Sequence, residues 1–344
     1  MIVSSGNTVY LIFASDSAVV DQGFVLTYAT APCPANCTVM TESGPTCSSF
    51  SCQCLLDDNG DLSCRPFAKS EIIARAGLAA HYDLARDQII AFGGRNYDTF
   101  MNDLHFFSFG AETWLSPRGN STTPLGVARF ASCMTEFGLY IHGGQTDTGA
   151  TSQFFVYNMG LTWASLTPRG DSPPALYGHT LTYVPSQMAM YLFGGYADSS
   201  GMSNRLYVFS IATGTWTKVE SSGGDPPATF GHIAVFHADT NNLYFHGGIR
   251  DSGRGTYASG DVFGFSLGTN RWITGLKASN YLRMHHAAAL IGHYIIFQGG
   301  SSPHTFYDSM QCYYGDMFAY DIRNAFFLSF CSSSSSSTLL TFAL

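Results

Sequence analysis

Charged side chains are scarce in this chain of 344 residues, and basic ones are scarcer than acidic ones. Only 12% of the residues are charged, and 16 Lys and Arg against 24 Asp and Glu leave a net charge of −8. No cluster of Lys or Arg is present that could neutralise a row of phosphates. The composition therefore argues against a nucleic-acid partner.

Long apolar runs are also missing. A helix that spans a bilayer needs about 20 consecutive apolar residues, whereas the longest apolar candidates lie at residues 9–13 and 339–344. The start, Met1-Ile2-Val3, lacks the basic residues and the cleavable apolar segment of a signal peptide. We therefore expect any membrane attachment to come only through parts absent from this chain.

The sequence further lacks the short motifs of common catalytic sites. It has no G-x-S-x-G turn for a nucleophilic serine, no H-E-x-x-H pair for zinc and no Gly-rich phosphate loop before a helix. We therefore predict a protein that is not an enzyme, with no catalytic residue, cofactor or bound metal.

Glycine and aromatic residues, in contrast, recur in a regular pattern. Five Gly-Gly pairs follow one another at steps of 50, 51, 53 and 52 residues, and they start at Gly93, Gly143, Gly194, Gly247 and Gly299. The four tryptophans of the chain follow the first four pairs at nearly constant distance, and Phe327 takes that place in the fifth unit; they are Trp114, Trp163, Trp216 and Trp272. The chain therefore contains an internal repeat of about fifty residues.

Each repeat contains an apolar run, a second run that ends in Gly-Gly, a polar loop, an alternating strand and the tryptophan. Short strands bounded by Gly, Pro, Asn and Asp indicate an all-β fold, and a period near fifty is typical of propeller blades. The glycines suit a crowded turn with positive φ. The tryptophans are expected to pack between blades, because a single repeat cannot bury so large an aromatic.

This pattern resembles the kelch repeat, whose hallmark is a diglycine followed by spaced aromatic residues. The resemblance covers about residues 75–330 and implies one four-stranded blade per repeat in a propeller at 72–330. The expected blades are 75–118, 126–168, 175–220, 228–277 and 283–330. We expect the parent propeller to have six blades, so five would leave a gapped ring, with the fifth blade not paired with the first.

The segment before the repeats has a different composition. Six of the nine cysteines lie between Cys33 and Cys64, with the spacing C-x3-C-x9-C-x4-C-x-C-x9-C. Such density in about thirty residues favours a disulfide framework, because so small a module buries little apolar surface. A zinc site is the alternative, but C-x2-C pairs and a nearby histidine are missing.

The cysteine spacing resembles an EGF-like module at 31–66. That resemblance implies three disulfides, Cys33–Cys47, Cys37–Cys52 and Cys54–Cys64. Residues 1–30 resemble the closing strands of a CUB domain, and residues 331–344 form a serine-rich, low-complexity tail. Cys133, in an apolar first strand, is expected to stay a reduced, buried thiol.

The order of a CUB remnant, an EGF-like module and a kelch propeller resembles the attractin and multiple-EGF-like-domain family. The resemblance implies an extracellular or cell-surface protein used in adhesion or receptor modulation. Two sequons, at Asn36 and Asn120, are candidate glycosylation sites in such a setting. The chain would then be a fragment of a longer protein.

The function that we predict is binding of a protein or glycan ligand by the loops on one face of the propeller. Tyr and Arg tend to carry interface energy, so the candidates for this binding face are the loop residues Tyr97, Tyr196, Arg250, Arg254 and Tyr257.

Two alternatives remain at this point. One is a secreted copper oxidase, because eleven histidines are present and kelch-like propellers include copper radical oxidases. His179 and His232, however, each stand 15 residues before a diglycine, which favours a structural role. The other alternative is an intracellular adaptor, whose cysteines would stay reduced.

Overall fold

The computed structural model describes residues 2–5, 8–11, 40–41, 44–45, 52–56, 62–66, 75–96, 99–109, 113–116, 123–158, 162–251, 255–276, 278–279, 282–301, 314 and 316–329. These residues form β-strands and one short 3-10 helix, η2 (Pro185–Gln187), with no α-helix among them. They include no helix of the length and apolar character that would cross a membrane. The all-β class expected from the sequence is confirmed.

Strands in the first 66 residues form three separate antiparallel hairpins. The pairs are β1 (Ile2–Ser5) with β2 (Thr8–Leu11), β3 (Met40–Thr41) with β4 (Gly44–Pro45), and β5 (Cys52–Leu56) with β6 (Leu62–Pro66). The rest of the expected CUB remnant and EGF-like module, and the tail at 331–344, lie outside the described residues. Both module assignments therefore stay predictions.

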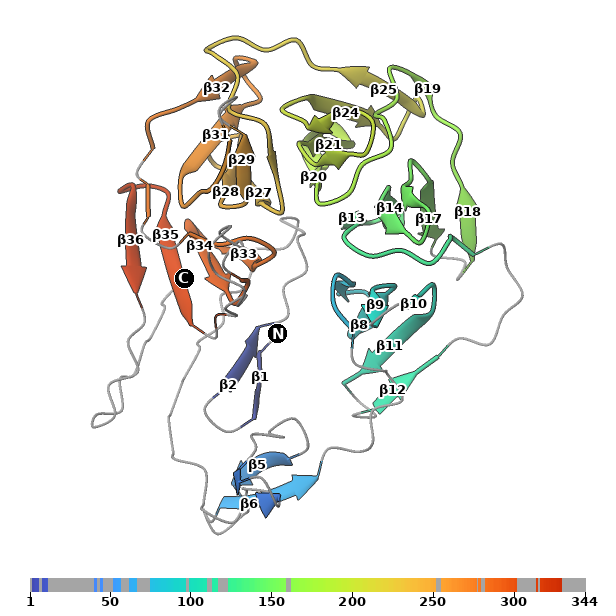
Figure 1. The fold of residues 1–344 in the computed structure, drawn as a ribbon, viewed down its shortest axis with the longest axis vertical. Coiled ribbons are helices and arrows are strands. Elements are labelled where there is room, and N and C mark those ends of the chain that lie inside the picture. The colour runs from blue at the N-terminus through green and yellow to red at the C-terminus, as the bar shows by residue number, and fades with distance from the viewer. Residues whose placement is uncertain are drawn as a thin grey trace.

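Five blades follow, one for each diglycine repeat, each with a core of four antiparallel strands, and they are arranged around a centre (Figure 1). Blade 1 contains β7 (Ala79–Asp83), β8 (Gln88–Phe92), β11 (Leu104–Ser108) and β12 (Thr113–Leu115). Blade 2 contains β13 (Ala131–Thr135), β14 (Gly138–His142), β17 (Phe154–Asn158) and β18 (Trp163–Ser165). Blade 3 contains β20 (Thr180–Val184), β21 (Ala189–Phe193), β24 (Leu206–Ser210) and β25 (Thr215–Lys218). Blade 4 contains β27 (Ile233–His237), β28 (Asn242–His246), β31 (Val262–Ser266) and β32 (Arg271–Ile273), and blade 5 contains β33 (Ala287–Ile291), β34 (Tyr294–Gln298), β35 (Met317–Asp321) and β36 (Phe326–Ser329).

The diglycines join each blade to the next. The backbone N–H of the second glycine donates to a carbonyl just before the first strand of the following blade, at distances of 2.7–2.8 Å. These bonds are Gly94 to Val127, Gly144 to Leu176, Gly195 to Thr229 and Gly248 to Arg283. The two glycines of every pair have positive φ, a conformation that glycine adopts without steric cost.

The repeated tryptophan packs against the preceding blade, as the repeat predicts. Trp163 of blade 2 lies 4.8 Å from Phe92 of blade 1, between ring centroids, and Trp272 of blade 4 lies 5.0 Å from Phe193 of blade 3. Phe327 takes the same position in blade 5, with its ring 5.9 Å from that of His246. The interfaces between blades are therefore aromatic and largely buried.

Cys133 lies in one of these interfaces and is fully buried, as expected. Its sulfur is 3.2 Å from that of Met190 in blade 3. Cysteine in such surroundings acts as a small apolar side chain.

The described sheets do not close into a ring through strand pairing. No sheet within the described ranges joins a strand of blade 5 to a strand of blade 1, and Figure 1 shows these two blades apart. Blade 3 has an additional outer strand, β19 (Arg169–Gly170), which pairs parallel with β25. The connection before blade 4 makes a similar single bridge, between Ser222 and Arg271, so in these two blades the entering connection extends the outer edge of the sheet.

Gly195→Val is expected to prevent folding of the propeller. The residue has φ +94°, and a Cβ atom there would lie 2.7 Å from Cβ of His179. Gly201→Val is the matched control, since that glycine also has a positive φ, +76°, but no atom within 4 Å of the added carbon. Soluble yield and thermal unfolding should be lost in the first variant and only lowered in the second. Equal loss in both would show that the close approach of Gly195 to His179 is unimportant.

Candidate ligand-binding face

One face of the propeller carries two kinds of loop. Short hairpins follow the diglycines of the first four blades: β9 (Arg95–Asn96) with β10 (Thr99–Phe100), β15 (Gln145–Thr146) with β16 (Gly149–Ala150), β22 (Tyr196–Ala197) with β23 (Gly201–Met202), and β29 (Ile249–Asp251) with β30 (Thr256–Ala258). Backbone bridges join the residue after the diglycine to the connection that enters the same blade, as between Tyr196 and Tyr177. In blade 4 this bridge is strand β26 (Thr229–Phe230), which pairs with β29. Hairpins and connections therefore lie on the same face, as expected.

A chain of backbone hydrogen bonds runs around the centre of this face. Each donor is the residue two positions before a first strand, and each acceptor is the equivalent residue of the preceding blade, at 2.7–2.9 Å. We call these residues the axial ring: Gly77, Arg129, Gly178, Gly231 and His285. All five have φ between +53° and +71°. They lie at the inner strands, which surround the centre in Figure 1.

An arc of aromatic side chains borders the axial ring. The ring centroids of Tyr177 and Tyr196 lie 5.4 Å apart, those of Tyr196 and Phe230 lie 6.1 Å apart, and those of Phe230 and His285 lie 6.0 Å apart. We call Tyr177, Tyr196, Phe230 and His285 the aromatic arc. Its three carbocyclic members are half-buried and His285 is exposed, so the arc offers apolar surface to a ligand.

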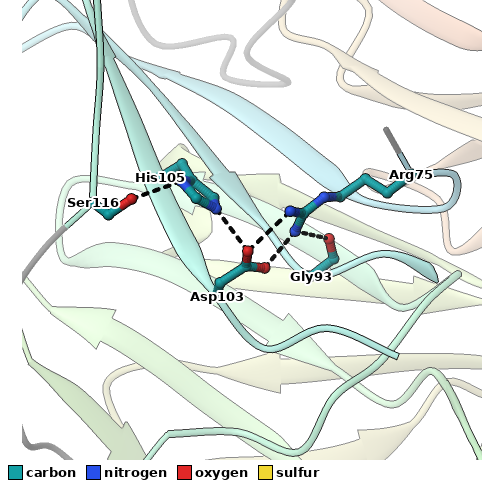
Figure 2. Close-up of polar contacts among 5 residues, drawn as sticks. All are labelled: Arg75, Gly93, Asp103, His105 and Ser116. Carbon is teal, nitrogen blue, oxygen red and sulfur yellow. Dashed lines mark hydrogen bonds and ion pairs between the residues drawn. The ribbon is translucent and has the colours of Figure 1, made fainter. Parts of the chain in front are cut away.

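Arginines with buried side chains hold the diglycine turns next to this face, as Figure 2 shows for blade 1. Arg75 donates to both carboxylate oxygens of Asp103 and to the carbonyl of Gly93 at 3.2 Å. The first glycine in turn donates to the carbonyl of Asp103, so this network ties the third strand to the diglycine turn. Desolvation acts to raise the pKa of Asp103, but hydrogen bonds from Arg75 and His105 outweigh it and lower the pKa.

Blade 5 has the equivalent ion pair, and blade 4 has a related one. Arg283 donates to both oxygens of Asp316, each at 2.9 Å, and to the carbonyl of Gly299 at 2.8 Å. In blade 4 the arginine comes from β29, after the diglycine: Arg250 donates to Asp261 at 2.6 Å. Because the pairs of blades 1 and 5 recur with the repeat and hold diglycine turns, they are structural.

The network of blade 1 also contains a serine and a histidine in series with the aspartate. The hydroxyl of Ser116 lies 2.9 Å from Nδ1 of His105, whose Nε2 lies 2.7 Å from Oδ2 of Asp103 (Figure 2). A Ser-His-Asp series can activate a nucleophile when the carboxylate stabilises the imidazolium. Here Arg75 already neutralises the carboxylate, which weakens that effect. We therefore interpret the series as an extension of the ion pair.

Histidines form polar contacts across every interface between described blades. His142 and His179 are 3.0 Å apart between ring nitrogens, and His246 and His286 are also 3.0 Å apart. The other two interfaces pair a histidine with a hydroxyl: His81 with Ser132 at 2.8 Å, and His232 with Thr180 at 3.2 Å. No group of three or more His, Cys, Asp or Glu in the described part of the chain is placed to hold a metal. The histidines therefore give no support to a copper centre.

The five candidate residues for the binding face fall into three groups. Tyr196 belongs to the aromatic arc, and Tyr257 is exposed on β30. Arg250 departs from the expectation of an accessible loop residue, since it is 5% exposed, pairs with Asp261 and lies over the ring of Phe263. Tyr97 and Arg254 lie outside the described residues.

Most of the remaining predicted sites also lie outside the described residues. Asn36, Asn120, Cys33, Cys37 and Cys47 lie outside the described residues. For the other cysteines only the backbone register is informative: Cys54 stands directly opposite Cys64 in the β5–β6 hairpin. Opposite residues of an antiparallel pair have Cα atoms about 4.5–5.5 Å apart, a separation that a disulfide can bridge. The pairing stays a prediction.

Sequence reasoning did not place Arg129 and His285 on the candidate binding face. The spacing to the diglycine conceals their equivalence to Gly178, because the first hairpin of a blade has two residues between its strands in blades 2 and 5 and four in blade 3. For the same reason His286 is equivalent to His179 and His232, although it stands 13 and not 15 residues before its diglycine.

Comparison with known proteins agrees with this architecture. Residues 89–342 match a family model described as the Attractin/LZTR1 beta-propeller. Over 266 residues the chain is 30% identical to the Multiple epidermal growth factor-like domains protein 8 of Rattus norvegicus and of Homo sapiens. That alignment covers 72% of this chain and 9% of each relative, so the chain spans less than a tenth of the length of those proteins.

Kelch proteins are more distant relatives. The identity to Kelch domain-containing protein 3 of Homo sapiens is 26% over 235 residues, which covers 64% of this chain and 60% of that protein. The identity to the Rab9 effector protein with kelch motifs of Xenopus laevis is 27% over 188 residues, with 52% and 50% covered. The kelch-type propeller expected from the diglycines is thus confirmed.

Proposed function

This chain belongs to the Attractin/LZTR1 β-propeller family, and we propose from that premise that its propeller is an extracellular, non-catalytic module that binds a protein partner. The observation that carries the proposal is the loop-bearing face, where hairpins and connections surround the axial ring. Hydrogen bonds between successive blades hold this face, and rigid scaffolds that present loops are the usual basis of recognition.

A protein partner is favoured over a glycan by the nature of this face. The aromatic arc offers apolar rings for burial, and Tyr and Arg are enriched among residues that dominate protein interfaces. Among the relatives, the Rab9 effector protein with kelch motifs is by its name an effector of another protein. A role in adhesion or receptor modulation would follow from a cell-surface location.

Capture of partners by the purified chain tests the binding role. The chain and two variants would be used as bait with cell-surface and secreted proteins, and captured proteins identified by mass spectrometry. Tyr196→Ala with Tyr257→Ala alters the loop-bearing face, and Leu84→Ser, at an exposed leucine in the turn between β7 and β8, alters the opposite face. Partners lost only with the tyrosine variant support the proposal, whereas partners lost only with Leu84→Ser place binding elsewhere.

The extracellular setting predicts the redox state of the cysteines. In secreted protein, Cys33–Cys47, Cys37–Cys52 and Cys54–Cys64 should be oxidised, each stabilising its module by about 2–4 kcal/mol, and Cys133 should remain reduced. Peptide mapping without reduction measures both. Six reduced thiols between Cys33 and Cys64 would contradict the extracellular setting and favour an intracellular adaptor.

A further inference from the structure

Three of the five axial-ring residues are glycine, and the other two are not. Gly77, Gly178 and Gly231 adopt left-handed φ values of +64° to +71°, but Arg129 and His285 adopt +54° and +53° at equivalent positions. A side chain in this region costs conformational free energy that glycine avoids. Non-glycine residues held in this way concentrate at functional sites, so these two side chains require an explanation.

Both side chains lie along the ring and are accessible. A Cβ atom built on Gly77 would lie 3.2 Å from Cγ of Arg129, and one built on Gly231 would lie 3.1 Å from Cε1 of His285. Each side chain thus occupies the space left by the glycine of the preceding blade. Both residues are exposed.

Arg129 lies within electrostatic range of both Tyr177 and His285. Desolvation raises the pKa of Tyr177, and the positive charge of Arg129 opposes that rise. Desolvation lowers the pKa of His285, and the charge of Arg129 lowers it further. Asp198 is the nearby negative group that also acts on Tyr177, but its Oδ2 accepts a hydrogen bond of 2.6 Å from the backbone of Ala150.

We propose that Arg129, His285 and the aromatic arc form a binding site for an acidic side chain of a partner protein. A planar guanidinium binds a carboxylate through two parallel hydrogen bonds, and a neutral imidazole can donate one more. The arc then packs against the apolar part of the same peptide segment. This proposal rests on the proposed function and names the chemistry of the partner.

The glycines at the equivalent positions of three other blades suggest the variants that test the site. Arg129→Gly introduces the residue that blades 1, 3 and 4 already have at this position. It removes the charge and also the conformational cost of a side chain at positive φ. Arg129→Gln removes the charge and keeps a side chain. Arg205→Gln is the matched control, because this exposed arginine stands at the start of a third strand, on the same face.

The probe is an array of short peptides that contain Glu or Asp beside an aromatic residue, each with a copy in which Gln or Asn replaces the acid. The peptide with the largest preference for the acidic form would be titrated by fluorescence anisotropy. We expect Arg129→Gly and Arg129→Gln to bind at least tenfold more weakly, and Arg205→Gln to bind within twofold of the unchanged chain. The melting temperature of Arg129→Gly should equal or exceed that of the unchanged chain.

Three results would overturn the proposal: no peptide preferred over its amide copy, unchanged binding by Arg129→Gly, or equal weakening by Arg205→Gln. A lower melting temperature for Arg129→Gly would also count against it, since it would make Arg129 a structural residue. Capture of protein partners by both Arg129 variants would leave the binding role standing and reject only this site. Failure to capture any partner would reject the binding role itself.

Discussion

Lowering the pH from 7.5 to about 4.5 is expected to unfold the propeller. Burial lowers the pKa of His142, His232 and His246 to about 3 and that of His81 to about 4, against an unfolded value of 6.5. Burial, followed by the charge of the partner histidine, also lowers the pKa of His179 and His286.

The sign of the effect follows from which state binds the proton. Below pH 6.5 the unfolded chain takes up protons at these histidines, whereas the folded chain does not until pH 3–4, so stability falls as the pH falls through this window. Two pKa units correspond to about 2.7 kcal/mol, so four such histidines could together remove roughly 10 kcal/mol at pH 4.5. A domain has about 5–15 kcal/mol in total.

The geometry of the histidine pairs explains why protonation cannot be accommodated. In the pair His142–His179 one ring nitrogen donates and the other accepts, so the accepting ring is neutral, and burial, which lowers the pKa of both histidines, keeps the donating ring neutral as well. Protonation of the acceptor would place two N–H groups against each other in a buried interface. The carboxylates of Asp103 and Asp316, whose pKa values are lowered, add their effect only at lower pH.

Urea unfolding followed by tryptophan fluorescence at pH 7.5, 6.0 and 4.5 measures this loss. His232→Gln should reduce the loss, because an amide can still bond to Thr180 but does not titrate. His293→Gln is the control, since this half-buried histidine lies in the turn between β33 and β34 and its ring contacts that of Tyr294 in its own blade. A free energy of unfolding that stays constant across this pH range would refute the prediction.

Most of the propeller can be predicted from the repeat, because glycine and tryptophan act locally. Each Gly-Gly requires a backbone that few other residues tolerate, and each tryptophan requires a neighbouring blade. Both residue types therefore recur in the sequence at nearly constant spacing, so the blades and the packing of Trp163, Trp216 and Trp272 could be predicted.

Features that depend on contacts between distant segments could not be predicted in this way. Strand β19 has two residues and no alternating pattern, and it exists only because the edge of blade 3 accepts it. Arg250 has the sequence context of a loop residue, but a β-bridge to the connection before its blade and the ion pair with Asp261 bury it. The φ of Arg129 becomes predictable only when Gly178 and Gly231 are recognised as its equivalents.

Trp216→Ala is expected to destabilise the propeller by about 3–5 kcal/mol, as a large core truncation does. Trp216 is 1% exposed, and its ring lies 5.5 Å from that of Phe154 in blade 2 and 5.1 Å from that of Phe209 in its own blade. The substitution therefore opens a cavity between blades 2 and 3. The two blades cannot shift toward each other to fill it, because the hydrogen bond from Gly144 to Leu176 fixes the spacing of their backbones.

Trp114→Ala provides the matched comparison, because it makes the same chemical change in a blade that follows no other described blade. Trp114 is half-buried, and the ring that it contacts, 5.3 Å away, is Phe107 of its own blade. We expect a loss of about 1–2 kcal/mol, since less apolar surface is exposed by truncation. Urea unfolding of both variants at pH 7.5 measures the difference. Equal losses would mean that the tryptophan acts within its own blade, and that contact between blades contributes little to the stability of the ring.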